Sequence, residues 1–243
     1  MFALTDSYLG GPDARGSYAE YVRVKEEWCA PVPASLPLRE AAAVPLVGLT
    51  AWQALQAAPQ GGGRRILILG ASGGVGQFAV QLACLRGLHV TGTCGADHAQ
   101  LVRDLGAEET FDYAAGCDAL GDAYGSSDAK KFDVILDLLG GDLMRCAVTR
   151  LLKPGATVIH VRNRGADEAM VAQLQEEVSK RGCAWHSIFV RPSGEMLAQL
   201  AQLIEAGKLR VHVAAVMPLE EVAKAHELVE GGHAGGKIVL KVA

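Results

Sequence analysis

The sequence has few aromatic residues and no excess of one charge, and both absences narrow its possible structures and functions. Aromatic residues make up 5% of the 243 positions, whereas hydrophobic residues make up 50%. The core must therefore consist mainly of aliphatic side chains, as in α/β proteins whose helices pack on a sheet. The formal net charge is −4, with 23 basic and 27 acidic residues spread along the chain. We therefore expect no nucleic-acid partner and no acidic-membrane surface.

Closely spaced metal ligands and long apolar runs are also missing. The six cysteines lie at least ten positions apart, and the seven histidines form no i, i+3 or i, i+4 pair. No apolar run reaches the length of a membrane span, and the N-terminus has no basic segment followed by an apolar core. We therefore expect a cytoplasmic protein with no metal centre and no disulfide framework.

A glycine-rich turn after a short apolar run is the most informative feature that is present. Residues 66–69 (Ile-Leu-Ile-Leu) predict a strand buried on both faces of a parallel sheet. Apolar residues at positions 75, 78, 79, 82 and 83 then predict a helix that lies on that sheet. The glycines between strand and helix allow a sharp turn and let a diphosphate approach the free N–H groups of the helix N-terminus. They are Gly70, Gly73, Gly74 and Gly76.

The segment after this helix supports a dinucleotide site. Residues 88–93 predict a second strand directly after Gly87, so a strand–helix–strand unit fits within about 30 residues, as the fingerprint requires. Two alternatives remain open. The glycines could serve only the turn, or residues 70–74 could form the G-x-S-x-G elbow of a serine hydrolase with Ser72 as nucleophile. Such an elbow follows a largely complete sheet, whereas only one short strand-rich segment precedes this one.

Further elements are predicted on both sides of this unit. Before it, residues 17–24 show strand alternation, and residues 38–55 indicate a helix interrupted by Pro45 and Gly48. After it, the pattern predicts strands at 133–139, 157–161 and 183–190, and helices at 167–180 and 193–206. We expect Ser193 to cap the last of these helices and Gly207 to end it.

Several motifs resemble the medium-chain dehydrogenase/reductase superfamily, in its zinc-independent quinone-oxidoreductase branch. The resemblance begins with G-S-Y-A-E-Y-V at 16–22 and A-A-A-V-P-L-V-G-L-T-A-W at 41–52, and continues through the glycine turn. Further matches follow in the family's order to the end of the chain: Leu105-Gly106-Ala107, Asp112-Tyr113, residues 132–137, Gly140-Gly141, Lys153-Pro154-Gly155, Gly207-Lys208-Leu209, Pro218-Leu219-Glu220 and residues 232–237.

The resemblance implies a Rossmann-type doubly wound parallel sheet together with a partial GroES-like β-rich domain. Its implied boundaries are 1–46 for part of the GroES-like substrate domain, 47–190 for the dinucleotide-binding domain, and 191–243 for a segment that returns to the first domain. Members begin with a longer substrate domain, so its larger N-terminal part is expected to be missing here. Zinc-dependent relatives carry four close cysteines between the positions of Leu4 and Gly16 and a cysteine ligand near Leu46, and this sequence has neither.

The resemblance also implies a set of cofactor contacts, in which Thr50 orients the nicotinamide and the glycine turn holds the phosphates. The set is Thr50, Ser72, Gly73, Gly74, Val75, Gly76, Gln77, Phe78, Gly95, Tyr113, Leu138, Gly140, Phe189, Val190, His233, Ala234 and Lys237. For Tyr113 and His233, a purely structural place in a strand end or loop stays open. In two positions the sequence departs from close relatives, with Gly95 in place of serine and Gly235 in place of arginine, which removes two expected phosphate contacts.

The residues after the second strand favour NADPH over NADH. An NAD enzyme usually has an acidic residue there for the ribose hydroxyls, whereas this chain has Thr93-Cys94-Gly95. The implied function is hydride transfer from NADPH to a quinone or an α,β-unsaturated carbonyl, with no catalytic residue identified and no zinc. The alternative is an NADPH-binding protein without turnover that acts as a structural or regulatory partner. Relatives commonly pair through the edges of their nucleotide-binding sheets, so a homodimer is expected.

Overall fold

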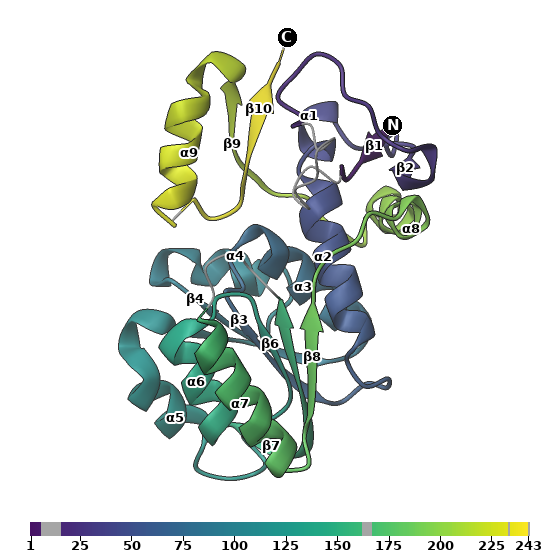
Figure 1. Cartoon of the computed structure of the whole chain (residues 1–243). Helices are drawn as coiled ribbons and strands as arrows, with labels where there is room; N and C mark the ends of the chain where they lie inside the picture. The colour runs from purple at the N-terminus through teal and green to yellow at the C-terminus, as the bar shows by residue number, and fades with distance from the viewer. Residues whose placement is uncertain (6–15, 162–166, 233, 243) are drawn as a thin grey trace. The chain divides into compact units, whose positions relative to one another are not determined.

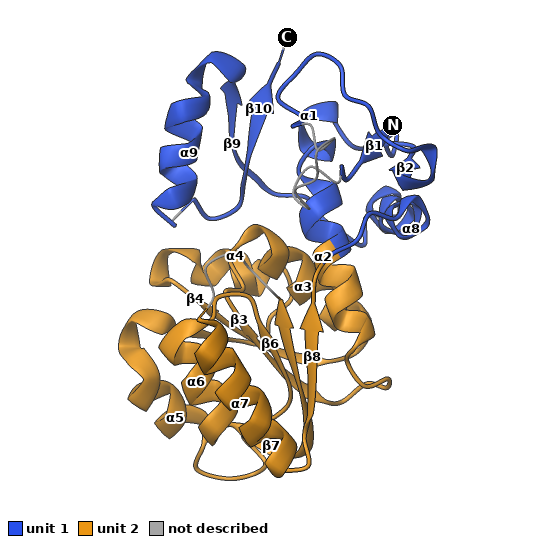
Figure 2. Ribbon diagram, in the orientation of Figure 1, with its two compact units in different colours: residues 1–49, 190–243 blue, residues 50–189 orange. Residues whose placement is uncertain are grey.

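The computed structural model describes residues 1–5, 16–161, 167–232 and 234–242 (Figure 1). The predicted contact at His233 lies outside these residues. The chain divides into two compact units, one formed by residues 50–189 and the other by residues 1–49 together with 190–243 (Figure 2).

The unit of residues 50–189 is built on a six-stranded parallel sheet. Its strand order is β5-β4-β3-β6-β7-β8. The strands are β3 (Arg65–Leu69), β4 (His89–Cys94), β5 (Glu109–Asp112), β6 (Phe132–Asp137), β7 (Leu152–Val161) and β8 (Ala184–Ile188). From the central β3 the chain moves outward to β5, then returns to β6 and moves outward to β8. This is a doubly wound sheet whose direction changes between β3 and β6, the place where such sheets bind ligands at the carboxyl ends of their strands.

Helices cover both faces of this sheet. They are α3 (Gly74–Leu85), α4 (Ala99–Asp104), α5 (Gly116–Tyr124), α6 (Gly141–Arg150) and α7 (Glu168–Lys180). The helices α5, α6 and α7 lie together on one face (Figure 1), where Met144 and Leu174 pack with Leu67 and Ile135 in a continuous apolar core. On the opposite face a Cβ at Gly92 would touch Val102 of α4, so glycine permits a close helix–sheet contact there.

The other unit contains two small sheets. In one, β1 (Phe2–Ala3) pairs antiparallel with β2 (Cys29–Ala30), and in the other β9 (Val213–Pro218) pairs parallel with β10 (Lys237–Lys241). The helices associated with this unit are α1 (Leu38–Ala41), the first part of α2 (Val44–Gln56), α8 (Gly194–Glu205) and α9 (Val222–Glu230). The α8 helix begins as predicted, because the Ser193 hydroxyl accepts the Met196 N–H at 3.2 Å, and Gly207 follows its end at φ 67°.

One predicted element is wrong, and another is interrupted at a different place from the one predicted. Residues 17–24 form no strand. The side chains of Tyr18, Tyr21 and Val22 are exposed, so their alternation has no buried face, and none of the described strands pairs with this segment. The predicted helix breaks at 42–43 instead of at Pro45 or Gly48. Pro45 is the second residue of α2, where a missing N–H costs no helical hydrogen bond, and Gly48 lies inside α2 without ending it.

The predicted strand–helix–strand unit is confirmed by β3, α3 and β4, with boundaries that differ by one residue. The strand predicted at 133–139 ends at Asp137. It ends there because the Asp137 carboxylate accepts the N–H groups of Leu139 and Gly140, which turns the chain. No helix within the described ranges is long and apolar enough to cross a membrane.

Candidate functional site

The glycine turn after β3 has a shape that only glycine permits at two positions. Gly70 adopts φ 88°, a conformation that side chains disfavour. At Gly76, an added Cβ would lie 2.1 Å from the Gly70 carbonyl oxygen and 2.7 Å from the Ala71 backbone. The first turn of α3 is therefore pressed against the end of β3. This close approach is what the third glycine of a dinucleotide fingerprint provides.

The N–H groups at the start of α3 are available to a ligand. The first N–H of this helix with an i−4 acceptor is that of Gln77, which donates to Gly73 O at 2.9 Å. Within the part of the chain that the structure describes, the N–H groups of Gly74, Val75 and Gly76 have no backbone acceptor, and no side chain caps the helix at Gly73. Such donors, together with the helix dipole, favour a bound anion. The residues therefore fit a dinucleotide phosphate.

Gln77 and Phe78 turn inward from this helix end, so they support the turn. Both side chains are buried, and Gln77 Nε2 donates to the Ser72 carbonyl at 2.7 Å. The Gly73 N–H donates to Gly70 O at 3.2 Å, which closes the turn from its other side. The predicted contacts of Gln77 and Phe78 with the cofactor stay predictions. The observed partner of the Gln77 side chain is a protein group, the Ser72 carbonyl.

A second part of the predicted site lies at the ends of β4 and β5. A Cβ at Gly95 would lie 3.4 Å from the Tyr113 hydroxyl, so the structure brings these two predicted residues together. Cys94 is buried beside them, and burial raises the pKa of its thiol. The positive charge of Arg103 lowers that pKa, whereas the negative charge of Asp112 raises it. Arg103 thus brings a positive charge close to the end of β4. The sequence pattern gave no sign of this proximity, because Arg103 reaches it from the following helix, α4.

The loop after β6 contains the predicted contacts Leu138 and Gly140, and a buried acid holds it. Asp137 is fully buried at the end of β6. One carboxylate oxygen accepts the N–H groups of Leu139 at 3.2 Å and Gly140 at 2.9 Å, and the other lies 2.8 Å from His160 Nδ1. Gly140 adopts φ 78°, which allows the chain to turn into α6. Asp137 and His160 were not among the predicted site residues.

The glycine turn and this loop are neighbours. A Cβ at Gly70 would come within 3.0 Å of the Leu139 side chain. Thr50 is buried at the start of the same unit, and Phe189 ends that unit with an exposed side chain. The structure therefore brings Gly70 and the residues near Leu139 together, whereas the roles predicted for Thr50 and Phe189 stay predictions.

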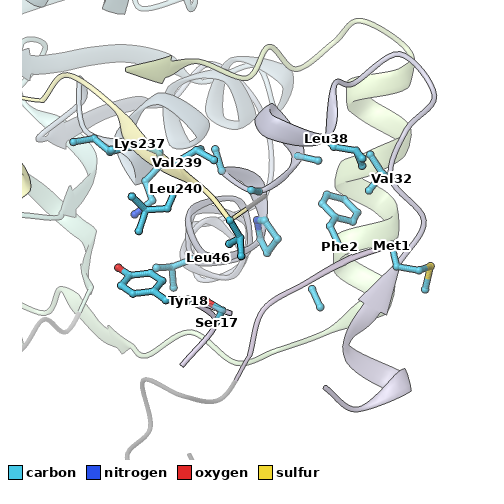
Figure 3. Close-up of a pocket in the computed structure, with 17 residues that line it drawn as sticks. Met1, Phe2, Ser17, Tyr18, Val32, Leu38, Leu46, Lys237, Val239 and Leu240 are labelled. Atoms are coloured by element: carbon cyan, nitrogen blue, oxygen red, sulfur yellow. The ribbon is translucent and has the colours of Figure 1, made fainter. Parts of the chain in front are cut away.

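The predicted contacts Val190, Ala234 and Lys237 belong to the other unit. Lys237, at the start of β10, lines a cavity of about 560 Å³ whose walls are mainly apolar. Figure 3 shows Lys237 and Leu240 of β10 on the same side of this cavity as Leu46 and Tyr18. Burial lowers the pKa of the Lys237 ammonium, because desolvation disfavours its charged form.

Metal-ligand clusters and disulfides are absent from the described residues. No group of three or more histidine, cysteine, aspartate or glutamate side chains could hold a metal ion in the ranges that the structure describes. The cysteines at positions 29, 84, 94, 117, 146 and 183 are all free thiols. The arrangement therefore offers anion-binding backbone groups and a buried Asp–His pair as its main chemical features.

Comparisons with known proteins show which family this chain resembles. The family model described as "Zinc-binding dehydrogenase" matches residues 105–240. The mitochondrial NAD(P)H oxidoreductase RTN4IP1 of Danio rerio is 37% identical over 255 residues, an alignment that covers 95% of this chain and 64% of the relative. The chloroplast envelope quinone oxidoreductase homolog of Arabidopsis thaliana is 33% identical over 241 residues, which covers 97% of this chain and 70% of that protein.

Solved structures show the same fold. An NAD-dependent alcohol dehydrogenase superimposes with a TM-score of 0.83 at 31% identity and covers 94% of this chain and 66% of its own. The quinone oxidoreductase of Coxiella burnetii gives a TM-score of 0.74 at 31% identity, with 84% and 60% covered. In the alignment with the Danio rerio relative, this chain spans less than two thirds of that protein's length. Together, the family model and these relatives show that the chain belongs to the zinc-binding dehydrogenase family of the medium-chain dehydrogenase/reductase superfamily.

Proposed function

We propose that this chain is an NADPH-dependent oxidoreductase that reduces a quinone or an α,β-unsaturated carbonyl compound without zinc. The observation that carries the proposal is the shape of the glycine turn, where Gly76 fits against Gly70 so closely that no side chain is possible. The N–H groups of Gly74, Val75 and Gly76 would hold the diphosphate. The relatives named NAD(P)H oxidoreductase and quinone oxidoreductase support the reaction class.

The end of β4 favours NADPH over NADH in this proposal. No acidic residue stands at Thr93, Cys94 or Gly95 to accept ribose hydroxyls or to repel a 2′-phosphate. Tyr113 lies against Gly95, and Arg103 acts electrostatically on the neighbouring Cys94. We propose that Tyr113 and Arg103 face the adenosine phosphate. Arg103 then partly replaces the phosphate contacts that Gly95 and Gly235 lack.

The protein's part in the chemistry is binding and orientation. When bound, NADPH supplies the hydride, and an electron-poor acceptor spreads the resulting charge onto oxygen, where solvent can protonate it. The chain holds the dinucleotide across the sheet's change of direction, between the turn after β3 and the loop after β6. Thr50 is assigned an orienting role, because an ordinary hydroxyl is a poor acid at neutral pH.

Titration of the purified chain with NADPH, followed by cofactor fluorescence, tests the first half of the proposal. Saturable binding in the micromolar range supports it, and no saturable binding below millimolar NADPH refutes it. Steady oxidation of NADPH after addition of a small quinone tests the second half. Binding without turnover would instead favour the structural or regulatory alternative. That alternative stays open because this chain covers only 64% of the length of a relative named as an oxidoreductase. If the reaction is independent of zinc, a chelator such as EDTA leaves its rate unchanged.

The cellular setting and the assembly are parts of the same proposal. Free thiols at all six cysteines fit a reducing compartment such as the cytoplasm, although the names of two relatives place them in mitochondria and chloroplasts. We propose a homodimer that pairs along β8, which forms one edge of the six-stranded sheet. Light scattering coupled to size-exclusion chromatography measures the mass of the assembly. A monomer at micromolar concentration would refute the homodimer.

A further inference from the structure

The carboxyl end of the six-stranded sheet carries a row of side chains that the proposed function has not yet used. By strand register, Thr93, Leu69, Asp137, His160 and Ser187 are neighbours across β4, β3, β6, β7 and β8. Asp137 and His160 are both almost completely buried, with exposed fractions of 0% and 2%. A buried carboxylate beside a buried imidazole is costly unless each group is hydrogen-bonded, so this pair needs an explanation.

The hydrogen bonds of Asp137 link the two strands to one loop. Its Oδ2 lies 2.8 Å from His160 Nδ1, so the imidazole donates from Nδ1, and its Oδ1 accepts the Leu139 and Gly140 N–H groups. The carboxylate is thus held from one side by β7 while it holds the loop on the other. If the donor from His160 were lost, the buried carboxylate would have to rotate or recruit water, and its hold on the two amides would weaken.

The His160 ring lies beside an aromatic ring of the next strand. Its centroid lies 5.8 Å from that of the Trp185 ring on β8, and Trp185 Nε1 donates to Ser187 Oγ at 2.9 Å. Three adjacent strands therefore each supply part of one support. Among these contacts of the described residues, only the hydrogen bonds from the Leu139 and Gly140 N–H groups connect this support to the loop after β6.

That loop lies where the nicotinamide half of a dinucleotide would bind. In a doubly wound sheet each half binds one mononucleotide, and the half that contains the glycine turn takes the adenosine side. The half formed by β6, β7 and β8 is then left for the nicotinamide side. The Leu139 side chain lies against Gly70, so this loop begins next to the turn that would hold the diphosphate.

We infer that His160 is a positioning residue for the nicotinamide half of the cofactor, and that it acts through Asp137 on the loop of residues 138–140. This inference deepens the proposed function and rests on it. It assigns a role to a side chain that touches neither the glycine turn nor any other predicted contact residue through the hydrogen bonds described above.

The test compares two ligands and two variants of His160. NADPH contains both halves of the dinucleotide, whereas adenosine 2′,5′-bisphosphate contains only the adenosine half. In His160→Gln the side chain keeps its polarity, but the longer chain moves its donor away from the Nδ1 position. In His160→Asn the amide nitrogen stays close to that position. Both variants are titrated by fluorescence or calorimetry with each ligand, alongside the wild type.

We expect His160→Gln to weaken NADPH binding about tenfold, the effect of losing one charge-assisted hydrogen bond. Its affinity for the bisphosphate should stay within about twofold of the wild type, and His160→Asn should restore most of the NADPH affinity. In NMR spectra, the amide signals of Leu139 and Gly140 should shift in His160→Gln and return to their wild-type positions in His160→Asn. Equal losses for both ligands, or no loss for either, would overturn the inference.

A matched control separates positioning from loss of stability. Val158→Ala removes buried atoms from the same face of β7, two residues before His160, at a position that pairs with Ile135 instead of Asp137. It should lower the unfolding temperature without changing the ratio of the two affinities. If Val158→Ala changes that ratio as much as His160→Gln, the inference fails. If the wild type binds neither ligand, the proposed function itself is refuted, a result distinct from an unchanged ratio in the His160 variants.

Discussion

Replacement of Gly76 by alanine provides the sharpest test of the glycine turn, because two physical effects predict opposite signs. Alanine in the first turn of a helix is intrinsically more stable than glycine by about 0.5–1 kcal/mol. In this structure, however, the new Cβ would lie 2.1 Å from Gly70 O, whereas real Cβ contacts below 3.0 Å essentially do not occur. The first turn of α3 would have to move away from β3 by roughly 1 Å, a displacement that can reduce function about 100-fold.

We expect the clash to dominate, since the atoms it meets are backbone and have no alternative rotamer. Overpacking of this kind costs about 1–3 kcal/mol and should lower the unfolding temperature by roughly 2–12 °C in a chain of this size. NADPH affinity should also fall, because the N–H groups that would hold the diphosphate move with the first turn of α3. Thermal unfolding and fluorescence titration measure the two effects.

Gly73→Ala is the matched control for this substitution. Gly73 has φ −71° and ψ 166°, which any residue can adopt, and its added Cβ would meet Gly70 O at an ordinary 3.4 Å. Its unfolding temperature should therefore stay close to that of the wild type, even if a methyl group there hinders the phosphate. If Gly76→Ala is more stable than the wild type and binds NADPH equally well, the close packing of the turn has been misjudged.

Three further predictions concern charge, thiol reactivity and helix capping. Arg103→Gln should reduce the preference for NADPH over NADH about tenfold, because a charge near the end of β4 is lost, and equal effects on both cofactors would contradict the proposed phosphate contact. Burial raises the pKa of Cys94, so this thiol should react slowly with iodoacetamide at neutral pH and faster as rising pH forms the thiolate. Peptide mass spectrometry measures the labelling, and full labelling of the folded protein at pH 7 would be inconsistent with the burial of Cys94. Ser193→Ala should remove the cap on the Met196 N–H and cost about 1 kcal/mol, or roughly 2–4 °C in the unfolding temperature, and an unchanged temperature would show that the cap contributes little.

The elements that were predicted well are those encoded by neighbouring residues. The buried run of β3, the apolar stripe of α3 and the glycines between them all lie within about 20 positions, so local pattern and local structure coincide. The cap at Ser193 follows from an interaction over only three residues. The segment 17–24 shows the limit of such reasoning, since its alternation is present but no partner strand among the described residues covers it.

The part of the candidate site that was missed depends on strand register. Asp137 and His160 are 23 positions apart and meet only because β6 and β7 pair in one particular register. That register includes an irregularity between Phe132 and Val134, where four residues of β7 (153–156) lie opposite the single residue Asp133 of β6. A local sequence pattern does not encode such a shift, so the buried pair could not be inferred from spacing alone. Arg103 was missed for a similar reason, because its effect on Cys94 depends on how α4 lies beside β4.

The carboxamide of Gln77 has a consequence for the kinetics of recognition. The buried Gln77 side chain donates a hydrogen bond to the Ser72 carbonyl, so the turn has its binding conformation before an anion binds. Association then needs little ordering of the backbone, so less entropy is lost on complex formation and the encounter rate should approach that of a rigid receptor. A single buried amide side chain would thereby let folding, instead of binding, supply the free energy that orders the phosphate-binding turn.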